Sequence, residues 1–176
     1  MSTKFFNNGL GNTLFDKLKG IASEMATFDR FLAVVGFFRS SGYFKLRKEL
    51  GDISEIKILV GINIDDIFRK HNKALLMLAD EDKAKEIYHN GFKEDIINAQ
   101  YSPEVEEGIL QMCEDLVSGR LQMRIHATKN LHAKFYLCLP QNHSEHSDGW
   151  VIMGSSNISD SGLGIKQPPQ YELMWQ

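Results

Sequence analysis

The residues best suited to chemistry lie near the C-terminal end of this chain. A histidine and a lysine stand two positions apart in LHAKFYLCLP (131–140), and MGSSNISDSGLG (153–164) follows after a polar stretch. Both protonation states of an ordinary imidazole are available near neutral pH, so His132 can act as a nucleophile or as an acid–base group. Lys134 can neutralise an anion beside it. The pair is suited to chemistry on an anion, although its spacing alone does not identify which one.

The direction of these side chains follows from strand geometry, because successive side chains point to opposite faces. If 131–139 is one strand, one face is apolar and consists of Leu131, Ala133, Phe135, Leu137 and Leu139. The other face carries His132, Lys134, Tyr136 and Cys138. We therefore expect the imidazole and the ammonium group to lie side by side, directed away from the core.

A tight turn is predicted at Gly154-Ser155-Ser156-Asn157, directly after the strand-like segment WVIM (150–153). Its backbone N–H groups, two hydroxyls and an amide suit a phosphate, since such donors can converge on one anion. Each part alone is weak evidence. His71-Asn72-Lys73 shows that the His-x-Lys spacing arises by chance, and a lone strand histidine is more often structural. The ordered combination favours a phosphate site.

The elements that must position these residues alternate between helix and strand. Helical spacing of apolar residues predicts a helix over about 10–26, and FLAVVGFF (31–38) reads as a buried strand. SSGYFKLRKEL (40–50) reads as a helix with serines as candidate caps, and EIKILVGI (55–62) as a strand, which predicts a parallel βαβ unit.

Helical segments are expected over about 72–119, the last opening with Ser-Pro and ending at Gly119. Short strands follow at LQMRIH, LHAKFYLCL, WVIM and YELMW. The expected architecture is one α/β domain over 1–176, with a mixed sheet flanked by helices.

The composition is that of a globular protein, with 43% apolar and 24% charged residues. No apolar run reaches the ~18 residues of a membrane span. There is no secretory signal pattern, and Cys113 and Cys138 form no C-x-x-C pair, so a reduced, cytoplasmic location is expected.

The net charge is −3, yet 116–144 contains no acidic residue and four Lys or Arg, which can focus positive potential on one cleft. A solvated basic edge explains the charge equally well.

A family resemblance rests on His132-Ala133-Lys134, Gly154-Ser155-Ser156-Asn157, Gly162-Leu163-Gly164 and Glu172. Together they resemble the catalytic motif of the phospholipase D superfamily. The likeness is greatest to its single-motif nuclease branch, which includes metal-independent restriction endonucleases, and to the N-terminal modules of some DEAD-box-like helicases. The resemblance implies a phospholipase-D-like mixed sheet and a DNA phosphodiesterase that needs no metal or other cofactor.

The resemblance also implies roles for single residues. His132 would attack phosphorus and form a phosphohistidine. Lys134 and Asn157 would hold the nonbridging oxygens. Glu172 would orient the imidazole, as the carboxylate does in a serine-protease triad. Assisting phosphate donors would be Ser155, Ser156 and the amides of the turn that begins at Gly154.

The family chemistry uses two histidines, whereas this chain has one motif. We therefore expect a homodimer in which His132 from each copy faces one phosphate. The family aspartate five positions beyond the lysine is Leu139 here, which motivates an alternative: a weak or inactive DNA-binding module. Because the chain stops at Gln176 in a strand-like segment, we expect a longer protein with a C-terminal helicase or restriction partner.

For several other features we prefer a structural explanation over a functional one. Lipid hydrolysis is disfavoured, since no interfacial apolar helix is evident. The loop 141–149 contains two histidines and two acids, but a polar hairpin connection is favoured over a metal site. Four cations follow the first predicted strand, and a solvated helix face is favoured for them over contact with a DNA backbone: Arg39, Lys45, Arg47 and Lys48. Base stacking by Tyr43, Tyr136 or Trp150 is less favoured than core packing.

Overall fold

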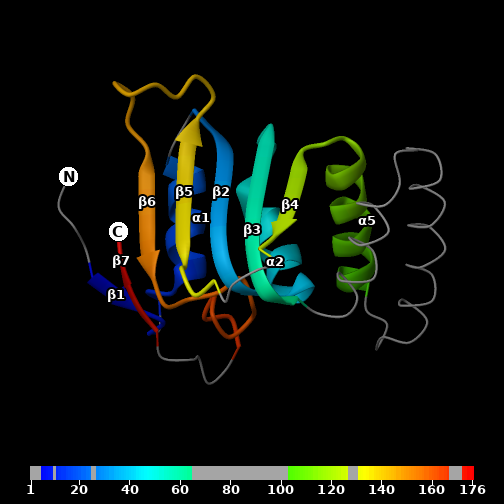
Figure 1. Ribbon diagram of the computed structural model, residues 1–176, viewed down its shortest axis with the longest axis horizontal. Helices are drawn as coiled ribbons and strands as arrows, with labels where there is room; N and C mark the ends of the chain where they lie inside the picture. Colours follow the sequence, from blue (N-terminus) through cyan, green and yellow to red (C-terminus); the bar gives the residue numbers. More distant parts are fainter. Residues whose placement is uncertain (1–4, 10, 25–26, 65–102, 127–130, 167–171) are drawn as a thin grey trace.

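The computed structural model describes residues 5–9, 11–24, 27–64, 103–126, 131–166 and 172–176. Within them, seven strands form one sheet in the order β1-β7-β6-β5-β2-β3-β4 (Figure 1). The strands are β1 (Phe5–Asn7), β2 (Phe28–Phe38), β3 (Glu55–Ile64), β4 (Leu121–Ile125), β5 (Phe135–Pro140), β6 (Trp150–Gly154) and β7 (Leu173–Trp175). The described helices are α1 (Leu14–Glu24), α2 (Ser40–Leu50) and α5 (Pro103–Val117).

The predicted βαβ unit is confirmed. β2 and β3 pair in parallel from Arg30 opposite Glu55, with α2 as the crossover, and β4 continues the parallel part. β5 pairs antiparallel with β2, so the sheet is mixed. The helix expected over 10–26 begins at Leu14, and α5 begins at Pro103 as its Ser-Pro start predicts. The helical prediction for 72–102 and the His71-Asn72-Lys73 pattern lie outside the described residues.

β1 was not predicted from the sequence. It pairs antiparallel with β7, with Phe5 opposite Trp175. The pairing places an N-terminal strand beside the C-terminal strand at one edge of the sheet, as Figure 1 shows. Three residues carry too little periodicity to be recognised without their partner.

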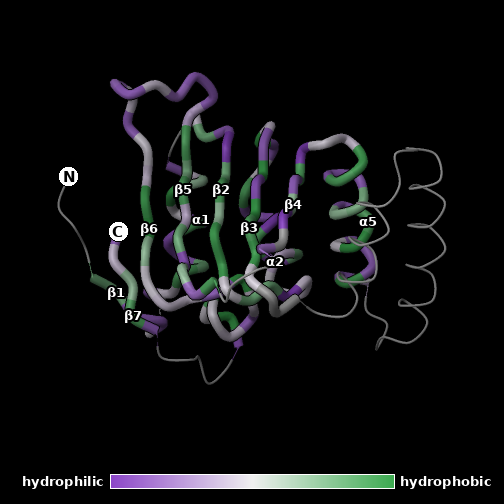
Figure 2. Tube along the Cα trace, in the orientation of Figure 1, coloured by the Kyte–Doolittle hydropathy of each residue, from purple (hydrophilic) through white to green (hydrophobic). Residues whose placement is uncertain are grey.

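The core lies between the sheet and the helices that cover one of its faces. In Figure 1, α1 and α2 lie behind the sheet, and α5 packs on α2 beside β4. The strand residues buried against them are Phe31, Ala33, Val35, Ile56, Ile58, Val60, Leu121, Met123, Tyr136, Cys138 and Ile152. No described helix covers the opposite face, which we call the open face; Leu32, Val34, Phe135 and Leu137 are half-buried there. Figure 2 shows that the central strands are largely hydrophobic, whereas the β5–β6 connection is hydrophilic.

The facing predicted for the fifth strand is wrong in two respects. β5 begins at Phe135, so His132 and Lys134 precede the strand and do not share a strand face. Tyr136 and Cys138 point into the core and not away from it. The tyrosine tolerates burial because its hydroxyl donates to the carbonyl of Ser156 at 2.8 Å. Pattern alone could not decide the facing, since both faces of this strand carry apolar side chains.

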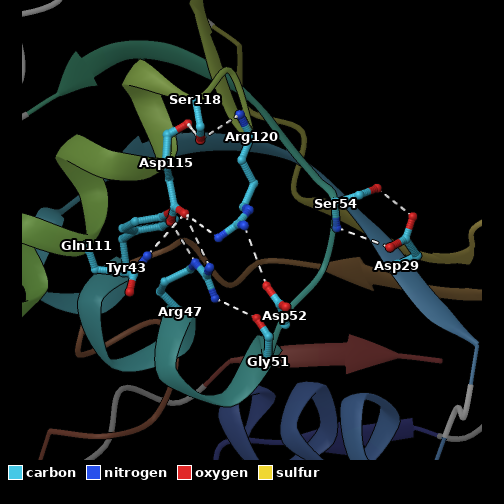
Figure 3. Close-up of polar contacts among 10 residues, drawn as sticks. All are labelled: Asp29, Tyr43, Arg47, Gly51, Asp52, Ser54, Gln111, Asp115, Ser118 and Arg120. Atoms are coloured by element: carbon cyan, nitrogen blue, oxygen red, sulfur yellow. Dashed lines mark hydrogen bonds and ion pairs between the residues drawn. The ribbon is translucent and has the colours of Figure 1, made fainter.

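The four cations after β2 do not share one role: Lys45 and Lys48 lie at the surface in ion pairs, whereas Arg47 belongs to the core. Arg47 is buried and donates to Asp115 through Nε at 2.6 Å, and Arg120 donates to the same carboxylate at 3.1 Å (Figure 3). Tyr43 and Gln111 also donate to Asp115, which is fully buried. Such pairing and hydrogen bonding is what a buried charge requires. This cluster therefore ties α5 to α2 and is part of the fold.

The remaining side features follow the simpler interpretations. Tyr43 and Tyr136 are fully buried, and Trp150 packs partly buried against the core. The loop 141–149 is an exposed connection between β5 and β6, in which His143 accepts or donates a 2.9 Å hydrogen bond with Ser147. None of the described helices is long and apolar enough to cross a membrane.

Candidate active site

Two glycines form the floor of the candidate site. A Cβ on Gly36 of β2 would lie 3.1 Å from the carbonyl oxygen of Leu131, and a Cβ on Gly61 of β3 would lie 2.9 Å from the same oxygen. The segment before β5 therefore crosses directly over both strands. Only glycine permits so close an approach of another backbone. The β2–β3 register also shifts between Val35 and Phe37, an irregularity common next to functional sites.

Lys134 lies where β5 leaves the sheet. Pairing between β2 and β5 ends at Val34 and Phe135, and the carbonyl of Lys134 accepts a 3.2 Å hydrogen bond from the N–H of Gly154. The Lys134 side chain passes over Gly36, with its Cε 3.7 Å from the position of a Cβ there. No carboxylate of the described residues pairs with this ammonium group. Its charge is available to an anion.

Asn157 reaches the same glycine from the loop after β6. Its Oδ1 lies 3.5 Å from the position of a Cβ on Gly36 and accepts a 2.9 Å hydrogen bond from the N–H of Phe37. Because the oxygen is engaged, the NH₂ group keeps its protons for other acceptors. Gly162 makes the turn possible, since a Cβ there would lie 2.4 Å from the carbonyl oxygen of Asn157. Lys134 and Asn157 thus converge on one point of the sheet.

His132 stands in the short segment that carries Lys134 over the glycine floor. Its side chain is exposed and forms no hydrogen bond or ion pair within the described part of the chain. An exposed imidazole of this kind is free to meet a substrate. Gly36 lies two residues after Val34 and four after Leu32 on β2, so it faces the same side of the sheet as they do. The candidate site therefore lies at one end of the open face.

Glu172 is 5% exposed and is held by Ser155, not by His132. The Ser155 hydroxyl donates to the Glu172 carboxylate and accepts a 3.1 Å hydrogen bond from the N–H of Leu173. Among the described residues, the expected hydrogen bond from His132 to Glu172 is not formed. The negative charge of Glu172, after burial itself, contributes to raising the pKa of Tyr136. In this structure Ser155 and Glu172 join the turn after β6 to β7.

The turn donors expected for phosphate are largely used by the fold, which corrects the prediction for them. The N–H of Gly154 donates to Lys134, and that of Ser155 donates to the carbonyl of Leu173 at 3.2 Å. Ser156 is fully buried, and its hydroxyl has no hydrogen-bond partner within the described residues. Gly154 is needed for packing, because a Cβ there would lie 2.3 Å from the carbonyl oxygen of Leu173. These contacts arise from pairing with β7, which local sequence does not disclose.

Sequence reasoning missed the glycine floor and the main-chain N–H of Phe37. A signal existed, since single glycines interrupt the apolar runs FLAVVGFF and EIKILVGI at equivalent positions. It also missed His126, which directly follows β4 at the edge where β2 and β3 end. The N–H of His126 donates to the carbonyl of Val60 at 2.8 Å, one residue before Gly61.

Comparison with known proteins adds evidence on the fold. No protein-family model matches the chain, and no curated protein is significantly similar to it. Yeast tyrosyl-DNA phosphodiesterase superimposes with a TM-score of 0.51 at 12% identity, over 99% of this chain and 31% of that enzyme's chain. A histidine-to-arginine variant of the yeast enzyme gives 0.50 at 12% identity, with the same coverage of both chains. The chain therefore spans about a third of the enzyme that it resembles, and it has the phospholipase-D-like α/β fold that its sequence predicts.

Proposed function

We propose that this protein is a phosphodiesterase that cleaves DNA without a metal, through a phosphohistidine on His132. The observation that carries the proposal is the convergence of Lys134 and Asn157 over Gly36, next to the exposed His132. The fold shared with an enzyme named as a tyrosyl-DNA phosphodiesterase supports DNA as the substrate class. The lysine supplies positive charge and the asparagine supplies N–H donors where a phosphate gains charge during displacement.

The proposed reaction has two displacements. A nitrogen of His132 attacks phosphorus, the P–O bond to the leaving nucleotide breaks, and a second imidazole gives that oxygen a proton. The same second imidazole then takes a proton from water, which attacks phosphorus and breaks the P–N bond. His132 is restored. We assign Glu172 and Ser155 a positioning role, in which they hold the turn that carries Asn157.

The second imidazole is proposed to be His132 of another copy in a homodimer. Mixing wild-type protein with an equal amount of His132→Ala, after subunit exchange, tests this. A composite site leaves about one quarter of the dimers intact, whereas independent sites keep about one half of the activity. His126→Asn is the matched control, because His126 lies at the same sheet edge. Loss of cleavage in that variant with linear mixing behaviour would assign the second imidazole to the same chain.

The main experiment is cleavage of end-labelled DNA in EDTA. We expect cleavage by the wild type, none by His132→Ala, and a transient label on the protein that survives alkali and is released by acid, as a phosphoramidate is. The control is a circular dichroism spectrum of His132→Ala, which should match that of the wild type if the variant is folded. Cleavage that stops on chelation, or that persists in His132→Ala, contradicts the proposal.

The alternative is a DNA-binding module with little or no turnover, and the substitution of the family aspartate by Leu139 motivates it. The structure offers a reason to prefer the enzyme. Leu139 lies four residues along β5 from Phe135, the first residue of the strand, and therefore roughly 13 Å from the end of the strand that adjoins the candidate site. Its side chain is 8% exposed and packs against Gly149. Tight binding without cleavage in EDTA or in added metal would favour the module.

Attachment to a helicase or restriction partner and a cytoplasmic location are further parts of this proposal. The sequence motifs support the attachment by resemblance alone, whereas the location is inferred from the cysteine usage. Reading the gene beyond the codon for Gln176 tests the first directly. A continuation that encodes no motor, methyltransferase or recognition domain would contradict it.

A further inference from the structure

A groove adjoins the candidate site at Asn157. It encloses about 370 Å³ and is lined by Asn157 together with residues from the N-terminal end of α2 and from the loop after β6, notably Arg39 and Lys166. Asn157 belongs to both places, because its side chain lies over Gly36 and also lines the groove. The groove and the candidate site are therefore continuous.

Neither cation of the groove forms an ion pair with a carboxylate of the described residues, although the charge of Lys166 contributes to lowering the pKa of Asp160. Within the described residues, the Arg39 guanidinium has only a long 3.5 Å contact to the carbonyl of Phe38, and the exposed Lys166 ammonium has no ion pair. Other cations of α2 are paired: Lys45 with Asp160 at 2.7 Å and Lys48 with Glu107 at 2.6 Å. Unpaired charge is thus concentrated beside Asn157, where an anionic ligand would meet it.

One acid also lines the groove, and its charge is already balanced. The Asp160 carboxylate accepts hydrogen bonds from Lys45 and from the Ser41 hydroxyl, each at 2.7 Å. Burial alone would raise the pKa of Asp160, but the contacts with Lys45 and Ser41 outweigh it and the pKa is lowered. Because the Lys45–Asp160 pair is neutral as a unit, Arg39 and Lys166 determine the sign of the groove. The Ser159 hydroxyl oxygen accepts from the N–H of Gly162 at 3.0 Å, which leaves its proton for another acceptor.

We propose that this groove binds a phosphate adjacent to the scissile one on the same DNA strand. A strand held at Lys134 and Asn157 continues into the groove, where Arg39 and Lys166 meet its next phosphate. The consequence is selectivity for a polynucleotide over an isolated phosphodiester. This inference rests on the proposed function, and it adds the feature of the substrate that the protein recognises.

Binding tests the groove without any need for cleavage. The probe is a fluorescein-labelled single-stranded oligonucleotide, and each groove variant is made in a His132→Ala background. We expect Arg39→Ala and Lys166→Ala each to weaken binding several-fold at low salt and to lower the slope of log K against log salt by roughly 0.7. In the Arg39→Ala/Lys166→Ala double variant the slope should fall by roughly twice that amount. Arg39→Lys, which keeps the positive charge, should keep the slope of the parent protein. Lys48→Ala is the matched control, being an exposed cation of the same helix outside the groove.

Kinetics test the selectivity. For the active protein, the ratio of kcat/KM on the oligonucleotide to kcat/KM on bis(p-nitrophenyl) phosphate, which has a single phosphate, should fall about tenfold in the double variant. An unchanged ratio, or an unchanged salt slope in Arg39→Ala and Lys166→Ala, overturns the groove proposal. If the wild type cleaves neither substrate, the proposed function fails while the salt slopes still decide whether the groove binds DNA. A protein that binds no oligonucleotide refutes the groove as well.

Discussion

The main-chain N–H of Phe37 donates a 2.9 Å hydrogen bond to the side-chain oxygen of Asn157, 120 residues further along the chain. The bond fixes which end of the amide faces β2. It therefore leaves the NH₂ group as the part that can meet a substrate oxygen.

Asn157→Asp is expected to lower the rate of cleavage without lowering the stability of the fold. The aspartate keeps an acceptor for Phe37 but replaces the NH₂ donors with negative charge beside the phosphate. We expect cleavage to fall by about 10²–10³-fold, the loss typical of one preorganised donor, with little change in Tm. Single-turnover cleavage and thermal unfolding measure the two effects. Wild-type rates in the folded variant would remove Asn157 from the site.

Gly36→Ala should lower cleavage by displacing the segment that crosses over Gly36. The added Cβ would lie 3.1 Å from the Leu131 carbonyl and 3.7 Å from Lys134 Cε, so the segment that carries His132 must move. We expect a loss of cleavage larger than the loss of stability explains. The matched control is Gly20→Ala in α1, where a Cβ meets nothing within 4 Å. That change should stabilise the protein by about 0.5–1 kcal/mol and leave cleavage unchanged.

Asp115→Ala should destabilise the protein severely. It removes the carboxylate that pairs with the buried Arg47 and with Arg120, and a buried charge left without its partner costs about 3–5 kcal/mol. Urea unfolding followed by circular dichroism measures the change in the free energy of unfolding. The exposed pair of Lys48 and Glu107 provides the contrast, since Glu107→Ala should cost less than about 1 kcal/mol. Equal effects of the two variants would contradict the structural role of the Asp115 cluster.

The pair of Asp160 with Lys45 makes a small pH-dependent contribution to stability. Because the pKa of Asp160 is lowered in the folded protein, its contribution is present above the unfolded pKa of about 4 and is lost as pH falls through the folded pKa. The difference in stability between wild type and Asp160→Asn should therefore be greatest near neutral pH and shrink below about pH 4. Solvent screening limits it to less than about 1 kcal/mol. Urea unfolding across pH 3–7 tests this, and a difference that grows on acidification would contradict it.

The two thiols should be unreactive in the native protein. Burial raises the pKa of Cys138 to about 12, and burial together with the charge of Glu114 raises that of Cys113 to about 11. The thiolate is the reactive form, so both residues should react slowly with Ellman's reagent at pH 8 and rapidly in urea. Fast native labelling of Cys138 would show that β5 opens.

The sequence by itself determined the parallel βαβ unit, the start of α5 and the identity of the chemical groups. These depend on local patterns: a largely apolar run for β2, helical spacing for α2, and Ser-Pro before α5. The same patterns could not decide which face of β5 enters the core. Both of its faces are apolar, and only the position of the helices makes Tyr136 and Cys138 the buried pair.

Tertiary structure alone decided the arrangement of the site. The floor under Lys134 and Asn157 exists because Gly36 and Gly61 lie on neighbouring parallel strands and let a third segment cross them. Pairing with β7 assigned Ser155 to Glu172 and consumed the turn amides that looked available. Such relationships join residues as far as 120 positions apart, as Phe37 and Asn157 are, and their energies come from close approach and hydrogen bonding that no local spacing encodes.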